Sequence, residues 1–296
     1  MFEIRHFCKM HRFDPEATAY LSAQYQKLEA NKDAYPLFIA QIKAYKDNSA
    51  FDHIPVFERL HTLEALTGIH RYTLDLIYLL SLMPILEESY RCEGIKKEYF
   101  DNFAGNLKTA ADNCQKTYGI WGTDIGWWLI DFFKHKLFSI GRLQYRRRKF
   151  RKDIGPYAQG TYYIDIHIPG GAPLTCDVCA ASYAEAADFF RQRYGMEKIL
   201  FGCHSWILSP EITAILPANS NILAFGSHYT VFETHIDPNS HAVSFIFNVP
   251  GVPADLDSLP EATSLQKAIK QHLKAGKTIN TAFGIMDYEK CKEELR

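Results

Sequence analysis

One segment of the sequence combines residue types and spacing that could bind an anion. Between Tyr162 and Ile168 apolar residues occupy alternate positions, which is the period-two pattern of a β-strand. Gly170 and Gly171 follow, and a helical pattern then starts near Thr175. Free N–H groups and the positive end of a helix dipole converge at such a junction, so it is a candidate site for a phosphate or pyrophosphate. A ligand-free strand, turn and helix explains the pattern equally well.

A basic run offers a second group of residues for phosphates. Arg146 and Arg148 belong to the run RRRKFRK, on or beside a predicted strand that precedes the glycine pair. Because a strand alternates its faces, only about half of these side chains could reach one ligand, which suits a few phosphates better than a nucleic-acid track. A charged, solvated strand edge is the competing interpretation. The sequence contains neither G-x-x-x-x-G-K-[ST] nor G-x-G-x-x-G, which argues against P-loop and dinucleotide-binding proteins.

Three side chains are candidates for a catalytic base. His204 ends a predicted strand, His167 precedes the glycine pair, and Glu233 lies on a later predicted strand. An imidazole with a pKa near ~6.5 accepts a proton at neutral pH, whereas a carboxylate does so only if burial raises its pKa. For each residue taken alone, an ordinary structural role outweighs catalysis.

The cysteines and serines suggest two other chemistries. Cys176 and Cys179 form a C-x-x-C at the start of the predicted helix, and Cys203 could join them in a thiol or zinc site. No second C-x-x-C or H-x-x-x-H accompanies them, so thiols that pack a helix onto a sheet are favoured. Ser205 follows His204, but the flanking glycines of a G-x-S-x-G nucleophile elbow are missing. Serine hydrolysis is therefore not indicated.

Two regions with different secondary-structure patterns must position these residues. Up to residue 136 the pattern is helical and no strand is predicted, with a first helix after Asp14. The further predicted helices are Tyr35–Tyr45, Val56–Leu66, Tyr72–Glu88, Lys96–Tyr118 and Thr123–His135. We therefore expect an α+β protein with an all-helical N-terminal domain over 1–136 and a mixed α/β C-terminal domain over 137–296.

The second region mixes strands with helices. The predicted strands are Leu137–Phe150, Thr161–Ile168, Lys198–Cys203, His228–His235, Ala242–Val249 and Thr278–Met286, of which His228–His235 and Ala242–Val249 are expected to pair. The predicted helices are Cys176–Tyr194, a short one from Ser209 to about Pro217, and Ala262–Ala275.

Composition limits the classes of partner. The chain has 296 residues, 47% of them hydrophobic, and a formal net charge of −1. No overall field draws nucleic acid or an acidic membrane, so anion selectivity must be local. The N-terminus lacks an apolar core of signal-peptide length, and the seven cysteines are dispersed as in proteins of reducing compartments. We expect a soluble cytoplasmic protein.

Several short motifs resemble a family of bacterial acyltransferases with a helical N-terminal domain and a C-terminal domain similar to the GNAT (Gcn5-related N-acetyltransferase) fold. The matching pieces are GRLQYR at 141–146, HIPGGAPL at 167–174, and CHSWILSP at 203–210 followed by LPANSNILAF at 216–225. Together with the helical first half, the resemblance covers most of the chain.

The resemblance implies a ligand for the anion site. In GNAT folds the fourth strand and the following helix bind the pyrophosphate of acyl-CoA through backbone amides, and the pantetheine arm lies between splayed strands four and five. Carried over, the arm would lie between the strand that ends at Ile168 and the strand Leu200–His204. The residues implied to bind the cofactor are Ile168, Gly170, Gly171, Ala172, Leu174 and Thr175, with Arg146 and Arg148 beside them.

The resemblance further implies an acyl-CoA-dependent N-acyltransferase in which an amine attacks the thioester directly. The amine must be neutral to attack, so a base is expected, with His204, His167 and Glu233 the candidates in that order. Acyl-CoA is the co-substrate, no metal is expected, and the acceptor is an amine of a small molecule or peptide. The helical domain would cover the acceptor site. The alternative is a non-catalytic module that senses acyl-CoA or another small ligand.

Overall fold

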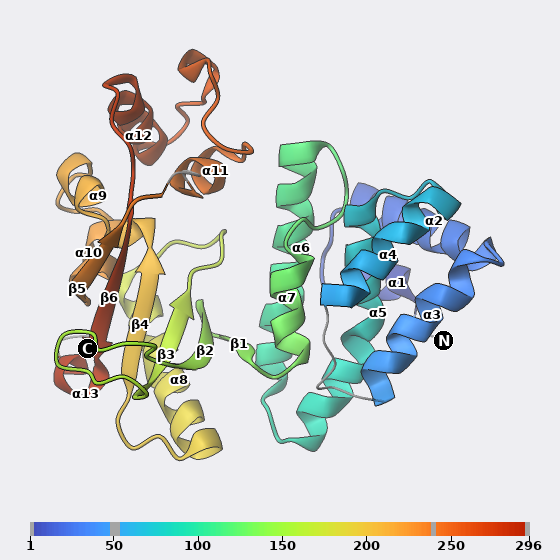
Figure 1. Cartoon of the computed structure of the whole chain (residues 1–296), viewed down its shortest axis with the longest axis horizontal. Coiled ribbons are helices and arrows are strands. Elements are labelled where there is room, and N and C mark those ends of the chain that lie inside the picture. The colour runs from blue at the N-terminus through green and yellow to red at the C-terminus, as the bar shows by residue number, and fades with distance from the viewer. Residues whose placement is uncertain (1–2, 48–53, 238–240, 294–296) are drawn as a thin grey trace. The chain divides into compact units, whose positions relative to one another are not determined.

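The computed structural model of the protein describes residues 3–47, 54–237 and 241–293, and the chain divides into two compact units. The first unit is Met1–Ser139 and the second is Ile140–Arg296. Helices make up the first unit, and a sheet with its own helices makes up the second (Figure 1).

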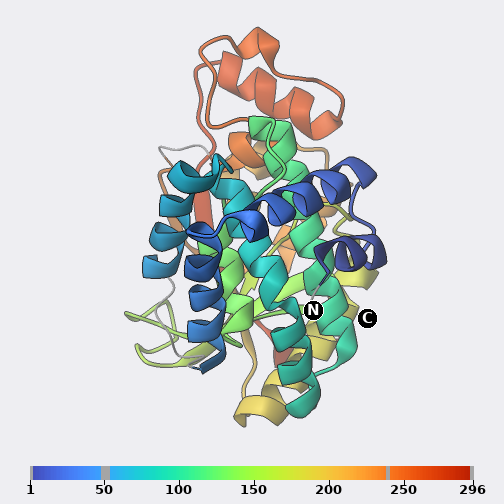
Figure 2. The ribbon, with the colours of Figure 1, turned by 90° about the vertical axis from the view of Figure 1, so that its right-hand side faces the viewer.

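The first unit is a helical bundle built around one buried helix, α5 (Arg71–Cys92). Every residue from Thr73 to Met83 is buried, and α5 contacts α1 to α4, α6 and α7. A helix that is apolar on all sides belongs in a core, because no face of it is suited to water. The helices around it, seen from another side in Figure 2, are α1 (Ile4–Met10), α2 (Pro15–Ala30), α3 (Ala34–Asp47), α4 (Ile54–Thr67), α6 (Lys97–Tyr118) and α7 (Gly126–Phe133).

Helix α1 was not predicted from the sequence, because the expected helical region begins at Asp14. Its seven residues carry only a short apolar stripe, of which Ile4, Phe7 and Cys8 are buried. Such a segment is too short for its helical period to be distinguished, and it forms because packing against α2 and α5 stabilises it.

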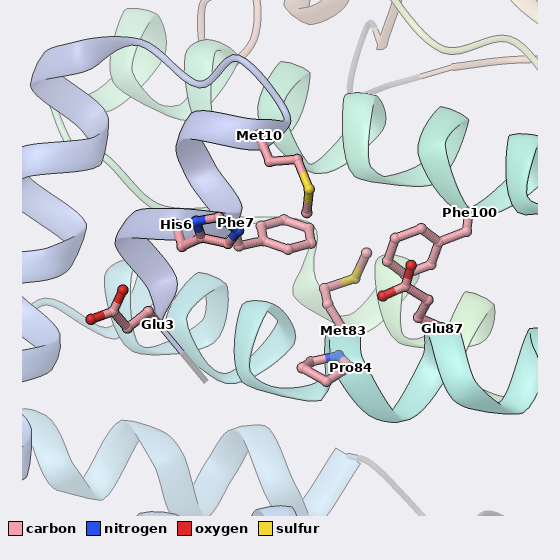
Figure 3. Close-up of a pocket in the computed structure, with 8 residues that line it drawn as sticks. All are labelled: Glu3, His6, Phe7, Met10, Met83, Pro84, Glu87 and Phe100. Atoms are coloured by element: carbon pink, nitrogen blue, oxygen red, sulfur yellow. The ribbon is translucent and has the colours of Figure 1, made fainter. Parts of the chain in front are cut away.

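A cavity of about 350 Å³ opens beside α1 within the first unit. Phe7, Met10, Met83 and Phe100 point toward one another in its wall, and the carboxylates of Glu3 and Glu87 lie at its edge (Figure 3). None of the residues expected to bind a cofactor or to catalyse lines this cavity.

The second unit carries the sheet, whose first strand begins in the last residues of the first unit, and one pair of neighbouring strands in its described residues is parallel. The strands are β1 (Leu137–Ile140), β2 (Leu143–Lys149), β3 (Tyr162–His167), β4 (Leu200–Ser205), β5 (Thr230–His235) and β6 (Thr281–Asp287), in the order β1-β2-β3-β4-β6-β5. β3 and β4 are parallel, whereas β2–β3, β4–β6 and β5–β6 are antiparallel. The predicted strand Leu137–Phe150 is two strands, which turn at Gly141, where φ is +55°.

Helix α8 (Cys176–Tyr194) makes the crossover from β3 to β4 and covers one face of the sheet. Its Tyr183 packs on Phe201 with ring centroids 5.4 Å apart, and its Ser182 Oγ lies 2.7 Å from the Tyr145 hydroxyl. Side chains alternate across a strand, so residues next to Tyr145 and Phe201 face the opposite side of the sheet. That opposite side carries the polar residues described below.

The chain between β4 and β6 forms a second small core. It contains η1 (Trp206–Leu208), α9 (Pro210–Ile215), α10 (Asn221–Ser227), α11 (His241–Phe247), η2 (Leu256–Ser258) and α12 (Ser264–Lys274). Ile212, Val243 and Ile269 are among its buried residues, and α11 and α12 lie beyond the end of β4 (Figure 1). The chain then closes with α13 (Tyr288–Cys291) after β6.

Helix α11 corrects a prediction, because Ala242–Val249 was expected to be a strand paired with His228–His235. Ala242, Val243 and Phe247 are buried at a spacing that places them on one helical face. Asp237 caps the helix, since its Oδ2 accepts the His241 N–H at 2.7 Å. β5 pairs with β6 instead.

Candidate active site

The pairing of β3 with β4 ends where the candidate residues lie. Their parallel register runs from Ile164 opposite Phe201 to Ile166 opposite Cys203. β3 continues to His167 and β4 to Ser205, beyond the last paired residues. Parallel strands that stop pairing leave edge N–H and C=O groups available to a ligand inserted between them.

The loop between β3 and α8 presents unpaired backbone amides. Within the described residues, the N–H groups of Gly170, Gly171, Ala172 and Leu174 donate no hydrogen bond to the backbone. Gly171 has φ +107°, a conformation that favours glycine because it has no Cβ. The loop is exposed from Gly170 to Pro173, whereas Leu174 is buried. These amides are open to an anion.

The loop is held from the side by an arginine that the sequence did not single out as a site residue. The Arg142 guanidinium donates to the carbonyl of Ala172 from Nη2 at 2.6 Å and from Nε at 3.0 Å. By binding carbonyl groups, Arg142 leaves the N–H groups of the loop unoccupied. The position of Arg142 directly after Gly141, in the turn between β1 and β2, was the available signal.

The first turn of α8 is partly engaged by its own carboxylate. Thr175 is the N-cap but its side chain makes no capping bond. Hydrogen bonds from the Thr175 side chain and from the backbone N–H of Val178 lower the pKa of Asp177. This carboxylate therefore competes with any anion for the end of the helix.

All three candidate bases line one pocket of about 310 Å³, on the face of the sheet opposite α8. Its polar lining consists of Arg148, Lys149, Arg151, Lys152, Asp165, Glu233, His167, His204 and His235. We call it the polar pocket. Its floor is aromatic: Tyr163 stacks on Phe150 at a centroid distance of 4.5 Å, over Gly202, where a Cβ would approach the Tyr163 ring to 2.7 Å.

Asp165 contacts three basic side chains on one side of the polar pocket. Its buried Oδ2 lies 3.3 Å from Arg146 Nη2, 3.2 Å from Arg148 Nη1 and 3.1 Å from His167 Nε2. Burial raises the pKa of Asp165, but the His167 hydrogen bond and the arginine charges outweigh it and leave this pKa lowered. The structure thus places Arg146 and Arg148 on Asp165.

His204 lies just beyond the part of β4 that pairs with β3, and its side chain lines the pocket. Its Nε2 is 2.9 Å from Thr281 Oγ1 on β6, and its ring centroid is 5.1 Å from that of His235. Loss of hydrating water, followed by the proximity of His235, lowers the pKa of His204. The imidazole is therefore neutral at pH 7. With Nε2–H donating to Thr281, Nδ1 keeps its lone pair for a proton.

Glu233 is paired with charged neighbours. Its Oε1 lies 2.5 Å from Lys152 Nζ, and its Oε2 lies 3.4 Å from His235 Nε2. The Glu233 carboxylate thus lies between the side chains of Lys152 and His235. Thr281 enters the site because β6 pairs with β4, and His235 because β5 pairs with β6. No local sequence pattern indicates either pairing.

The other chemistries suggested by the sequence find little support. Burial raises the pKa of Cys203 well above the ordinary thiol range and raises that of Cys179 to about 11, so both are poor nucleophiles. No group of three His, Cys, Asp or Glu side chains suited to a metal occurs among the described residues. Ser205 Oγ accepts the N–H of Ile207 at 3.2 Å as a helix cap.

The search for helices able to cross a membrane, over the described part of the chain, found none.

Comparison with known families identifies the fold. Residues 137–286 match the family described as a GNAT-like C-terminal domain, and residues 2–135 match the N-acyltransferase N-terminal domain. The first of these matches spans half of the chain. The protein therefore belongs to the family of proteins with a GNAT-like C-terminal domain, as the sequence motifs predicted.

Solved structures share this architecture over nearly the whole chain. An acyltransferase in complex with decanoyl-CoA and teicoplanin aligns with TM-score 0.66 and 20% identity, over 96% of this chain and 99% of its own. An acyltransferase in complex with decanoyl-CoA aligns with TM-score 0.65 and 22% identity, over 97% and 99%. The comparison with curated proteins found no match. At these identities the likeness establishes the fold.

Proposed function

We propose that the protein is an acyl-CoA-dependent N-acyltransferase. The observation that carries the proposal is that the β3–β4 pairing ends at Ile166 and Cys203, next to the glycine loop on one strand and to His204 on the other. We place an opening for the cofactor arm there. The similar structures add support, because they are of acyltransferases in complex with decanoyl-CoA and with CoA.

In this proposal the glycine loop holds the pyrophosphate. The N–H groups of Gly170, Gly171, Ala172 and Leu174 donate to it, while Pro169 and Pro173 have no N–H to offer. The pantetheine arm follows the opening past Ile166 and Cys203 and brings the thioester to His204. Arg146 and Arg148 pair with Asp165, and their expected role beside the phosphates stays a prediction.

The chemistry is a direct transfer. The acceptor nitrogen attacks the thioester carbon, His204 Nδ1 takes the proton that the nitrogen loses, and the carbon–sulfur bond breaks to release CoA as a thiolate that solvent protonates. His204 acts first because its lowered pKa keeps it neutral, and a positioned base contributes ~10²–10⁴-fold. His167 is committed to Asp165 by its Nε2, so we place it second. Glu233 supports His235.

The proposal is tested by following free CoA thiol while acyl-CoA and amines are mixed with the protein. We expect amine-dependent release that falls about 10²–10⁴-fold in His204→Ala, with the Kd for acyl-CoA unchanged. His228→Ala is the matched control, because His228 lies before β5 and outside the polar pocket. Tight binding without release for any amine would instead favour the sensing module, and no binding would overturn the proposal.

A further inference from the structure

The charges of the polar pocket are divided between its two sides. One side, formed by the end of β2 and the residues after it, supplies Arg148, Lys149, Arg151 and Lys152. The other, formed by β4 and β5, supplies His204, His235 and Glu233. The lining therefore has a basic wall facing a wall of proton acceptors.

The basic wall carries more charge than the pocket neutralises. Arg148 pairs with Asp165 at 3.2 Å and Lys152 with Glu233 at 2.5 Å. Lys149 rests on the ring of Tyr162, 4.6 Å from its centroid. Arg151 makes no ion pair with any residue that the structure describes. Arg151 is thus a basic residue of the lining with no ion pair among the described residues, and a bound group of negative charge would balance it.

The position of the basic wall separates its positive charge from the proposed cofactor site at the glycine loop. The glycine loop precedes α8, which packs on the other face of the sheet, whereas the polar pocket lies on the face of Asp165 and His204. Register places Arg148 opposite Tyr163 and ends the β3–β4 pairing at Cys203, next to His204. Neighbouring strands lie about 4.8 Å apart and each residue advances about 3.3 Å, so the Cα atoms of Arg148 and His204 lie roughly 16 Å apart. Arg151 and His204 both line the polar pocket, so a small amphoteric molecule bound there would lie beside both.

We propose that the acceptor is an amine that also carries a carboxylate, which binds Arg151 and its basic neighbours while the amine lies at His204. Guanidinium groups match carboxylates with two parallel hydrogen bonds, which fixes orientation as well as charge. Glu233 and His235 at the other wall suit the amine as it loses its proton. This inference rests on the proposed acyltransferase function and adds the chemical class of the acceptor.

The test uses matched pairs that differ only in the carboxylate: leucine with leucinamide, phenylalanine with phenylalaninamide, and a dipeptide with its C-terminal amide. CoA release is measured with saturating acyl-CoA, and thermal stabilisation by each compound is measured with CoA bound. We expect the acids to react and to stabilise the protein, and the amides to do so weakly. The amides are the weaker bases and hold more neutral amine, so a preference for the acids cannot come from amine reactivity.

Two variants test whether Arg151 binds the carboxylate of the acceptor. Arg151→Gln is expected to raise KM for the acids roughly fivefold or more, to leave the amides unaffected, and to leave the Kd of acyl-CoA unchanged. The control is Lys267→Gln, because Lys267 is an exposed residue of α12 outside the pocket. Equal responses to the acids and the amides, or no response to either, would overturn the inference about the acceptor. If the protein still binds acyl-CoA in that case, the proposed function is left intact. A weakened Kd for acyl-CoA in Arg151→Gln would assign the basic wall to a phosphate of CoA instead, and would also overturn it.

Discussion

At the scale of single residues, the site depends on keeping one imidazole uncharged. The pKa of His204 is lowered from its model-compound value of 6.5, first by loss of water and then by His235. A base with a lowered pKa stays unprotonated at more acidic pH, so kcat/KM, divided by the fraction of the amine that is neutral at each pH, is expected to begin falling only below about pH 6.5. His235→Ala removes a neighbouring positive charge and admits water, and both effects raise the pKa of His204. The acidic limb of the pH–rate profile should therefore move to higher pH, and a shift to lower pH would contradict this role.

Asp165 is the residue on which the basic side of the pocket depends. Asp165→Asn removes the negative charge that Arg146, Arg148 and His167 share. Because the two arginines are partly exposed, we expect the free energy of unfolding at pH 7 to fall by about 2 kcal/mol, below the range for a fully buried pair. Urea unfolding measures the change. Asp188→Asn, at an exposed pair on α8, is the control and should change little.

Asp165 should also affect how the stability of the protein depends on pH in the acidic range. A carboxyl group whose folded-state pKa is lowered stabilises the protein above its unfolded pKa, near ~3.9, and that stability is lost as pH falls through the folded value. The pKa of Asp165 is lowered, so wild-type stability should fall through this acidic range. In Asp165→Asn this part of the pH dependence should be missing, and an unchanged pH dependence would show that Asp165 contributes nothing to it.

At the scale of elements, the β3–α8 junction was the most predictable part of the site. Alternating apolar residues predicted β3, and the glycine pair and helical period predicted α8 with the observed bounds Cys176–Tyr194. These signals are local, because strand and helix periods are set by neighbouring residues. The placement of Arg146 and Arg148 on Asp165 depends on the β2–β3 register, which sequence spacing alone does not fix.

The pairing of β5 with β6 was less predictable for the same reason. Ala242–Val249 has the β-branched and aromatic composition of a strand, yet Asp237 caps it and a small core selects its helical face. Long-range contacts therefore decide which strand brings Glu233 and His235 to His204. A sequence can name these residues as titratable, but only the fold places them in one pocket.

The glycine loop provides a test at this scale. Gly171→Ala puts a Cβ on a residue with φ +107°, which costs about 1–3 kcal/mol unless the loop changes conformation. Either outcome disturbs the amides, so we expect the Kd for acyl-CoA to rise, measured by titration calorimetry. Ala172→Ser is the control, since it alters an exposed side chain of the same loop and leaves the backbone preference unchanged. An equal effect of the two substitutions would mean that the backbone of Gly171 is unimportant for binding.

The N-terminus of α8 allows a test in which the affinity for acyl-CoA is expected to rise instead of fall. Asp177→Asn removes a carboxylate that receives hydrogen bonds from Thr175 and Val178 at the first turn. A pyrophosphate on the neighbouring amides would then meet less repulsion, and affinity for acyl-CoA should rise roughly twofold to fivefold at low ionic strength. High salt should remove most of the gain. Unchanged affinity at low salt would place the diphosphate away from this helix end.

At the scale of the whole molecule, ligand binding should appear as stability. A ligand that binds only the native state adds RT ln(1 + [L]/Kd), about 2.7 kcal/mol at a hundredfold excess over Kd. For units of this size each kcal/mol raises Tm by about 2–4 °C, so CoA, acetyl-CoA and longer acyl-CoAs can be ranked by thermal shift. We expect CoA itself to stabilise the protein, because the loop amides bind its diphosphate, and each productive acyl chain to add to that shift. Adenosine diphosphate should give a smaller shift than CoA, since it lacks the arm that fills the opening between β3 and β4. If CoA and all acyl-CoAs leave Tm unchanged at millimolar concentration, the opening is not a cofactor site.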